Sequence, residues 1–147
     1  KEKMELVDIV GNCSVYNSYV VSDHDTNSNY SSFYKDWVGK SIDGDIDDII
    51  IISKIGGVIS GFISCKNVTS SVGKIGLLGI LNGLSDKPIR QNLLYMAIKW
   101  FQSQDIVFVN VVTQGWNINA QSLYKYCKFI PYRRELWYRR LFTNNCD

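Results

Sequence analysis

The sequence predicts an α+β domain with one mixed sheet, and three observations lead to this class. Two Ile- and Val-rich runs flank a Gly-Gly turn, an apolar stripe at helical spacing covers residues 88–103, and a strand-like apolar run over 106–113 separates two helical segments. The resulting order of hairpin, strand, helix, strand, helix and strand is typical of the class. A chain of 147 residues has the size of one domain, so we expect a single domain over residues 1–147.

The first part of the chain carries the weaker signals. Residues 4–21 alternate loosely between apolar and polar and contain several β-branched residues, which predicts one or two short strands or irregular extended pieces. Residues 22–32 are polar and rich in turn-forming residues, which predicts a loop. Large apolar residues then recur at roughly helical spacing over 31–42, after serines that suit an N-cap, so we expect a helix there.

The middle of the chain has the pattern of a hairpin followed by a third strand. Residues 48–66 hold two arms rich in Ile and Val, and Gly56 and Gly57 supply the turn between them. Residues 73–81 form a further strand that contains several glycines. Glycine inside a strand often marks the close approach of a ligand or of another backbone.

Alternating helices and strands complete the chain. Pro88 suits the first turn of a helix over 88–103, and the run over 106–113 has the near-continuous apolar character of a buried central strand. A short helix is expected over 117–128, and a last strand over 135–142.

Composition and charge exclude several classes of protein. Hydrophobic residues make up 46% and charged residues 20%, so the chain is neither disordered nor fibrous. The 16 Lys and Arg against 14 Asp and Glu give a net charge of +2, which argues against a nucleic-acid binder. No apolar run is long enough for a membrane helix and no signal-peptide pattern opens the chain, so we expect a cytoplasmic protein. Because the chain begins with Lys1 rather than Met, we expect further residues upstream.

The four cysteines indicate neither a zinc site nor a disulfide framework. They are widely spaced, form no C-x-x-C pair and accompany a single histidine in the whole chain. A domain of this size builds its own core without disulfides. We therefore expect free thiols in a reducing compartment, and no metal.

Two stretches in the second half carry a resemblance to a known family. Residues 73–101 (GKIGLLGILNGLSDKPIRQNLLYMAIKWF) combine a strand, a loop and a long helix. The family pattern of a Val, an Asn, an Ala, a Leu-Tyr pair and a Phe is met by Val111, Asn117, Ala120, Leu123, Tyr124 and Phe129. Over about residues 30–143 the chain thus resembles the GNAT superfamily of acyl-CoA N-acetyltransferases. More narrowly, it is similar to bacterial dTDP-fucosamine acetyltransferase-like nucleotide-sugar N-acetyltransferases.

The resemblance implies a fold, a cosubstrate and a set of contacts. The fold would be a mostly antiparallel mixed sheet flanked by helices, with a fourth strand (74–81) and a fifth strand (106–113) that splay apart. The cosubstrate would be acetyl-CoA, with its pantetheine arm on the freed edge of the fourth strand beside Gly76 and Gly79. Its diphosphate would lie at the N-terminus of the helix over 88–103. The residues implied to bind the cofactor are Leu78, Gly79, Ile80, Ser85, Lys87, Arg90, Gln91, Asn117 and Ala120.

The loop before that helix departs from the family pattern. The family has two glycines where this chain has Pro88 and Arg90, and proline has no N–H to donate to a phosphate. Asp86 adds a negative charge, whereas Lys87 and Arg90 could supply charge-assisted hydrogen bonds. The loop is therefore either a non-standard diphosphate site or a decayed one.

Tyr124 is the proton donor that the resemblance implies. Acyl transfer expels CoA as a thiolate, whose thiol has a pKa of roughly 8.5, and a phenol within reach can protonate the departing sulfur. The alternative is that Tyr124 simply packs in the core. Asn117 has two compatible roles, as an N-cap and as a partner of the pantetheine arm. Ala120 either lets the cofactor pass closely or packs its helix.

No general base for the acceptor amine is evident. His24 is the only histidine, but it lies in a polar loop, where a solvated side chain is the simpler interpretation. The same interpretation applies to the acidic candidates, which are Asp23, Asp25, Asp45, Asp47 and Asp48. A chain of waters would also serve, so the base stays unassigned.

Two hypotheses for the function follow. The first is an acetyl-CoA-dependent N-acetyltransferase of a small amine, above all an amino sugar or a nucleotide-linked amino sugar. The second is a catalytically silent GNAT-like module that binds a ligand or a partner. Four arginines frame the last strand and either hold a nucleotide diphosphate or form a solvated basic face. They are Arg133, Arg134, Arg139 and Arg140. The last strand would also allow pairing across a homodimer.

Overall fold

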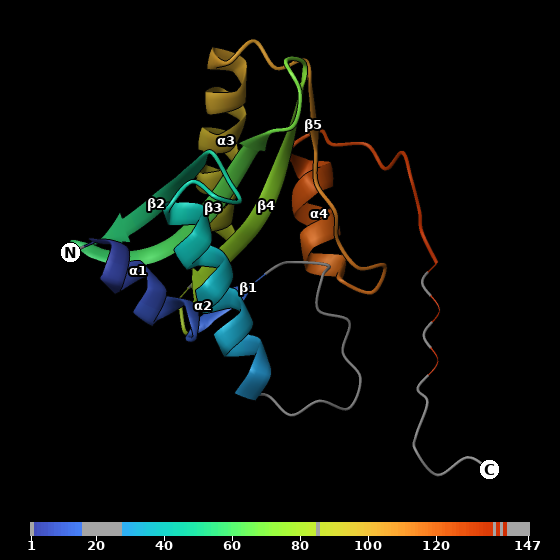
Figure 1. The fold of residues 1–147 in the computed structure, drawn as a ribbon. Helices are drawn as coiled ribbons and strands as arrows, with labels where there is room; N and C mark the ends of the chain where they lie inside the picture. The colour runs from blue at the N-terminus through green and yellow to red at the C-terminus, as the bar shows by residue number, and fades with distance from the viewer. Residues whose placement is uncertain (1, 16–27, 85, 137, 139, 141–147) are drawn as a thin grey trace.

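A sheet between two pairs of helices makes up the part of the chain that the computed structural model describes, which is residues 2–15, 28–84, 86–136, 138 and 140. The helices are α1 (Glu2–Val10), α2 (Ser28–Ile42), α3 (Asp86–Ser103) and α4 (Ile118–Tyr126). The strands are β1 (Cys13–Val15), β2 (Ile49–Ile55), β3 (Val58–Asn67), β4 (Val72–Leu81) and β5 (Phe108–Asn110). Helices α1 and α2 cover one face of the sheet, and α3 and α4 cover the other (Figure 1).

Strand β4 is the centre of the sheet. Along one edge it pairs with β3, which in turn pairs with β2, and both pairings are antiparallel. Two short strands share its other edge: β5 runs parallel to it at Val72–Lys74, and β1 runs antiparallel to it at Gly79–Leu81. Residues 75–78 lie between these two partners. This is therefore the stretch of β4 whose second edge has no strand beside it in the described part of the chain.

The hairpin of β2 and β3 confirms the expected turn. Gly56 has a φ of +57° and Gly57 a φ of +85°. Positive φ at both central residues is the geometry of a two-residue turn that matches the twist of the flanking strands, and glycine adopts it without strain. The hairpin supplies two strands of the sheet, and its longer strand, β3, pairs with β4.

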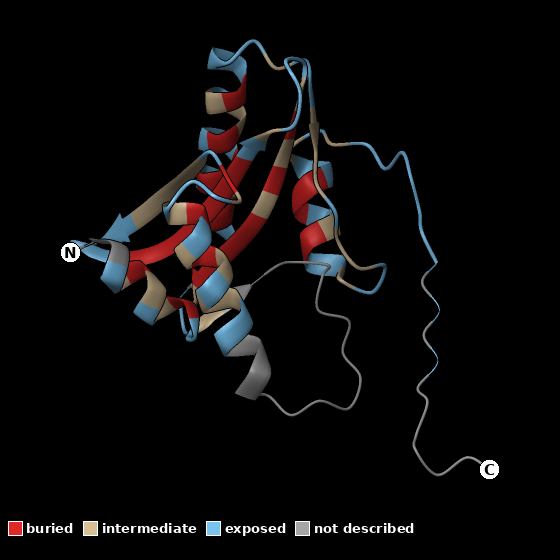
Figure 2. Ribbon diagram, in the orientation of Figure 1, coloured by how far each residue is buried: buried red, intermediate tan, exposed pale blue. Residues whose placement is uncertain are grey.

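Each face of the sheet has its own apolar core. The face under α1 and α2 buries Leu6, Val10, Val38, Ile59, Phe62 and Leu77. The face under α3 and α4 buries a larger set that runs from Ile63 and Ile75 through Leu93, Leu94 and Phe101 to Leu123 and Tyr124. Figure 2 shows the buried positions concentrated in β3, β4 and the inner sides of the helices.

Helix α1 stands where strands were expected over residues 4–21. Leu6 and Val10 lie four residues apart, which places them on one face of a helix, and both are buried against the sheet. The β-branched residues between them suggest a strand, but the difference in helix propensity is small and packing outweighs it. Among the described residues of this region only Cys13–Val15 form a strand, and residues 16–21 lie outside the described part of the chain.

Two further expectations about strands are wrong. Strand β5 has three residues instead of the eight of 106–113, and Val107 and Phe108 are 68% and 65% exposed instead of buried. It lies at the edge of the sheet, where no strand covers its outer side within the described residues. The described residues of the last strand expected over 135–142, which are 135, 136, 138 and 140, form no strand and are exposed (Figure 2), whereas the other four positions lie outside the described residues.

Candidate functional site

Helix α3 follows directly after β4 and presents cations at its first turns. Pro88 is the third residue of the helix, where its missing N–H removes no intrahelical hydrogen bond. Lys87 is exposed at this end, whereas Arg90 is only 9% exposed. The free N–H groups of the first turn and the positive end of the helix dipole favour an anion at this place.

Helix α4 begins at a capped end, as expected. The Ala120 N–H donates to the Asn117 side-chain oxygen at 3.1 Å, which satisfies one of the free donors of the helix. Ala120 is 1% exposed and belongs to the apolar core on this face of the sheet. Asn117 therefore has a structural role in the geometry observed, and Ala120 packs its helix.

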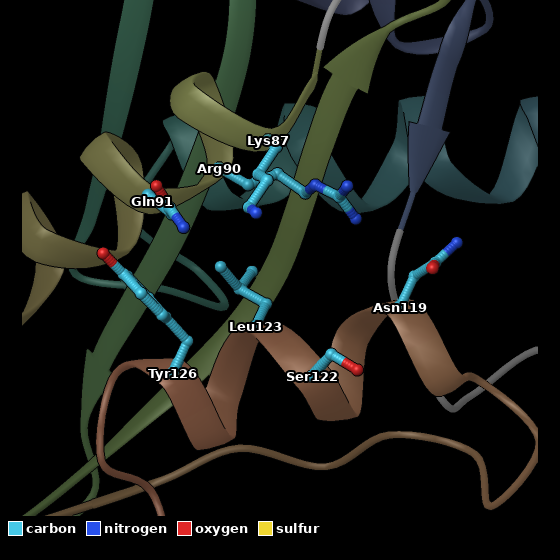
Figure 3. A pocket seen from close by; sticks show the side chains of 7 residues that line it. All are labelled: Lys87, Arg90, Gln91, Asn119, Ser122, Leu123 and Tyr126. Carbon is cyan, nitrogen blue, oxygen red and sulfur yellow. The ribbon is translucent and has the colours of Figure 1, made fainter.

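A pocket of about 240 Å³ lies between the first turns of α3 and the side of α4 that faces them. Its walls are formed by Lys87, Arg90 and Gln91 from α3 and by Asn119, Ser122, Leu123 and Tyr126 from α4. Figure 3 shows the side chains of the two helices facing each other across it. The pocket thus combines two cations with amide, hydroxyl and phenol groups, and its size suits part of a larger ligand.

The pocket joins expected residues with others that sequence reasoning missed. Lys87, Arg90 and Gln91 were expected at the cofactor, and the structure brings them together. The three polar residues of α4 were missed, although Asn119, Ser122 and Tyr126 are spaced i, i+3 and i+7. That spacing places side chains on one face of a helix, and it is the signal that could have found them.

Tyr124 is a buried phenol without a hydrogen-bond partner among the described residues. It is 6% exposed, and its hydroxyl oxygen is sealed from solvent. Burial raises the pKa of Tyr124 to about 12, and the nearby Arg90 guanidinium opposes that rise in the pKa. The Tyr124 ring lies 5.8 Å from the Phe129 ring, and the Phe129 N–H donates to the Tyr124 carbonyl oxygen at 2.9 Å. A buried donor left unpaired in this way calls for a functional explanation.

Strand β4 bulges where its second edge is open. In the pairing with β3, Ile63 lies opposite Leu78 while Cys65 lies opposite Ile75, so β4 holds one residue more than its partner. The Leu77 N–H leaves the ladder and donates to the Ser64 hydroxyl oxygen at 2.9 Å. A bulge next to an open edge is a frequent feature of functional sites, because it redirects backbone groups.

The three residues expected on the pantetheine arm lie at and beside this edge. Gly79 and Ile80 are opposite Val15 and Ser14 of β1, and Leu78 is the next residue along β4. Strand β1 therefore covers part of the edge on which the arm was expected. The pantetheine arm was expected to pair with a free edge of β4, whereas the structure places β1 against Gly79–Leu81 of that edge.

The glycines of β4 do not leave room for a ligand, contrary to expectation. A Cβ at Gly79 would meet the Phe62 ring at 2.4 Å, and a Cβ at Gly76 would meet the Ser64 hydroxyl at 2.7 Å. Both spaces are thus filled by side chains of β3. The glycines permit the close packing of β3 side chains over β4, which is the structural reason for glycine in a strand.

Asp47 was expected on a solvated surface, and the structure shows it buried at 3% exposure. Its Oδ2 accepts a hydrogen bond from the Ser41 hydroxyl at 2.6 Å and one from the Trp37 indole N–H at 3.3 Å. Its Oδ1 would lie 2.9 Å from a Cβ at Gly76. Asp47 is therefore hydrogen-bonded to the end of α2 and lies beside the bulged part of β4. These hydrogen bonds cannot be predicted from the sequence, because Trp37 and Ser41 belong to α2 and reach Asp47 only in the folded chain.

The remaining expected residues do not meet at this place. Ser85, His24, Asp23 and Asp25 lie outside the described residues. Asp45 and Asp48 are exposed, and Asp48 Oδ2 accepts a hydrogen bond of 2.7 Å from the Asn67 N–H. Among the arginines of the C-terminal segment, Arg139 also lies outside the described residues, and Arg133 is exposed and pairs with Glu135 at 2.8 Å. Cys13, Cys65 and Cys127 are free thiols.

No group of three or more His, Cys, Asp or Glu in the part of the chain that the structure describes could hold a metal ion. None of the described helices combines the length and the apolarity that crossing a bilayer requires.

No protein-family model and no curated protein matches this chain in sequence. Solved structures match it in fold. A transcriptional regulator from Bacillus halodurans C-125 has a TM-score of 0.66 at 14% identity, over 95% of this chain and 93% of that one. The N-acetyltransferase PseH of Campylobacter jejuni, in complex with acetyl coenzyme A, has a TM-score of 0.56 at 22% identity, over 74% and 76%. The aminoglycoside N-acetyltransferase AAC(6′)-Iy, in complex with CoA, has a TM-score of 0.57 at 17% identity, over 72% and 77%.

These likenesses confirm the expected fold class. The chain has the GNAT fold, with a mixed and mostly antiparallel sheet flanked by helices and a fifth strand that leaves the fourth after a short parallel pairing. Because every identity is below 25%, the likeness concerns the fold, and the activity has to be argued from the site.

Proposed function

We propose that this protein is an acetyl-CoA-dependent N-acetyltransferase that acts on a small amine. The observation that carries the proposal is the pocket at the first turns of α3, which combines Lys87 and Arg90 with polar side chains of α4. In the same fold, PseH and AAC(6′)-Iy are described as complexes with acetyl coenzyme A and CoA. The proposed cosubstrate is thus supported by the N-terminus of α3, which favours an anion, in a fold whose similar structures are described as complexes with CoA or acetyl coenzyme A.

The residues of the pocket suit the diphosphate of CoA. Lys87 supplies a mobile ammonium, and Arg90 a guanidinium that can make two parallel hydrogen bonds to phosphate oxygens. Gln91, Asn119 and Ser122 add neutral donors on both sides of the pocket. Side-chain cations thus stand in for the backbone donors that the family's two glycines would expose, which favours a non-standard diphosphate site over a decayed one.

Tyr124 would act on the thioester sulfur, at which CoA leaves. The amine nitrogen attacks the thioester carbonyl carbon, the C–S bond breaks, and the proton that the amine loses balances the one that sulfur gains. With a pKa raised to about 12, the phenol of Tyr124 stays protonated at neutral pH and is always a donor. It is a weaker acid than the CoA thiol, whose pKa is roughly 8.5. Tyr124 therefore acts mainly through a hydrogen bond to the sulfur as negative charge develops there.

The acceptor would be an amino sugar or a nucleotide-linked amino sugar. The narrower resemblance of the sequence supports this class, and one of the similar structures is named an aminoglycoside N-acetyltransferase. Asp47 beside the bulge of β4 is buried and hydrogen-bonded, and His24, the single histidine of the sequence, lies outside the described residues, so we assign no side chain as the base. A chain of waters to solvent is the simplest route for the amine proton.

A catalytically silent binding module is the second candidate, and one observation favours it. Strand β1 lies against β4 at Gly79–Leu81, where the pantetheine arm would need the edge. A protein that keeps this pairing permanently would hold a ligand in the pocket between α3 and α4 without positioning a thioester at β4.

Release of CoA, measured with a thiol reagent, separates the two candidates. The protein is mixed with acetyl-CoA and a panel of amino sugars, nucleotide-linked amino sugars, aminoglycosides, polyamines and amino acids, and an amine-free reaction corrects for the protein's own thiols. We expect release that depends on one class of amine. Binding of acetyl-CoA without release for any amine would favour the silent module.

A further inference from the structure

We propose that β1 is a displaceable strand that blocks the acyl-CoA site, so that the protein alternates between a closed form with β1 on β4 and an open form with that edge free. The inference rests on the proposed function, because it concerns the control of the same site. Its basis is the pairing of Cys13, Ser14 and Val15 with Leu81, Ile80 and Gly79.

The hydrogen-bond pattern shows which backbone groups β1 occupies. The Asn82 N–H donates to the Asn12 carbonyl oxygen at 3.0 Å, so these two residues form a hydrogen-bonded pair that extends the ladder. Such pairs alternate in an antiparallel ladder, which makes Ser14 and Ile80 the next one. The N–H and C=O of Ile80 are therefore directed at β1. These are backbone groups that a ligand lying along this edge of β4 would need.

Within the described residues, β4 has an open outer edge at residues 75–78, and β1 occupies the stretch that continues it. The opposite edge of β4 pairs with β3, and β5 occupies the outer edge at Val72–Lys74. An extended ligand that lies along the outer edge beyond the bulge thus competes directly with β1. In the closed form the two cannot bind together, because each backbone group of Ile80 serves one partner.

Strand β1 lies at the margin of the core, where its partly buried Cys13 packs. It has three residues, whereas the neighbouring α1 is anchored by Leu6 and Val10. A turn separates the two, in which the Asn12 N–H donates to the Ile9 carbonyl oxygen at 2.8 Å. Release of β1 past this turn leaves α1 in place. A ligand that binds only the open form loses apparent affinity in proportion to the closed fraction.

A reversible disulfide tests the proposal. Cys13 lies opposite Leu81 in a non-hydrogen-bonded pair, where Cα atoms are about 4.5 Å apart, within the range of a disulfide. The Leu81→Cys variant, in a background with Cys127→Ser and Cys146→Ser, should lock β1 onto β4 when oxidised. The matched control adds Cys13→Ser and cannot form the bond. Peptide mapping by mass spectrometry verifies the bond.

The expected result is a loss of acetyl-CoA binding of at least about tenfold on oxidation, seen by calorimetry and restored by reductant, with no change in the control. Unchanged affinity of the oxidised protein would overturn the proposal and leave the proposed function intact. Absence of binding to wild type and reduced variant alike would overturn the proposed function, and the proposal with it.

A second pair of variants acts in the opposite direction. Ser14→Pro removes the N–H that faces Ile80, whereas Ser14→Ala keeps it. We expect Ser14→Pro to bind acetyl-CoA several-fold more tightly than wild type and Ser14→Ala to bind like wild type. Equal or weaker binding by Ser14→Pro, at an unchanged circular dichroism spectrum, would contradict a competing strand.

Discussion

The carboxylate of Asp47 accepts a hydrogen bond of 2.6 Å from the Ser41 hydroxyl, and both side chains are buried between α2 and the sheet. The Asp47→Ala variant removes the hydrogen bonds that its carboxylate accepts from Ser41 and Trp37, and a hydrogen bond to a charged group is worth roughly 1.5–3 kcal/mol. We expect urea denaturation to show that loss. Asp45→Ala is the matched control, because Asp45 is exposed, and it should stay within about 0.5 kcal/mol of wild type.

Two glycines are expected to respond to alanine in opposite directions. A Cβ at Gly76 would meet Ser64 and Asp47 at under 3 Å, so Gly76→Ala should destabilise the protein by about 1–3 kcal/mol. Gly39 lies inside α2 with nothing within 4 Å of its Cβ position, so Gly39→Ala should stabilise it by about 0.5–1 kcal/mol. Thermal unfolding measures both. The packing described around the bulge is wrong if the two variants shift in the same direction.

Tyr124→Phe should separate activity from stability. The Tyr124 hydroxyl is buried and has no hydrogen-bond partner among the described residues, so its removal should leave stability unchanged or slightly higher. If the hydroxyl assists the departing thiolate, turnover should fall by about 10²–10⁴ while the affinity for acetyl-CoA hardly changes. Steady-state kinetics and calorimetry give the two numbers. Wild-type turnover in this variant would refute the role.

The free energy of unfolding should decrease at alkaline pH, because three weakly acidic groups are buried in the folded protein. Burial raises the pKa of Cys13 to about 11, of Cys65 to about 12 and of Tyr124 to about 12, from ordinary values of 9.0, 9.0 and 10.0. Between the unfolded and the folded pKa, the unfolded chain has lost a proton that the folded chain retains. Unfolding is then favoured as pH rises, so stability that is full below pH 9 is lost progressively above it.

The midpoint of urea unfolding, measured from pH 7 to pH 11, tests this expectation. Tyr124→Phe should decline less steeply than wild type above pH 10, because it lacks one of the three groups. A midpoint that does not fall over this range, or a steeper fall in Tyr124→Phe, would show that these groups are not buried as described.

Elements with their own local signals could be predicted from the sequence. Gly56 and Gly57 predict the turn of the hairpin, Asn117 predicts the start of α4, and Pro88 predicts the first turn of α3. In each case the residue type is required by the backbone at that position, so no knowledge of the rest of the chain is needed. Lys87 and Arg90 were expected because the resemblance aligns them with the family's diphosphate loop, at a helix start that Pro88 marks.

The features that depend on distant contacts could not be predicted. Asp47 looks like one of several acidic loop residues until Trp37 and Ser41 are brought to it by α2. The pairing of Cys13 with Leu81 joins two positions far apart in the chain, and no local pattern announces it. The short β5 carries an apolar run that suggests a central strand, but only pairing on both edges would bury it.

Calorimetric titration with acetyl-CoA tests the central claim, which is that the pocket between α3 and α4 holds the cofactor. We predict measurable binding by wild type and a loss of about tenfold in Lys87→Ala, which removes a hydrogen bond to a charged group. Lys125→Ala makes the same change of charge on the exposed part of α4, outside the pocket, and should bind like wild type. No heat at millimolar acetyl-CoA, or equal weakening in the two variants, would contradict the account.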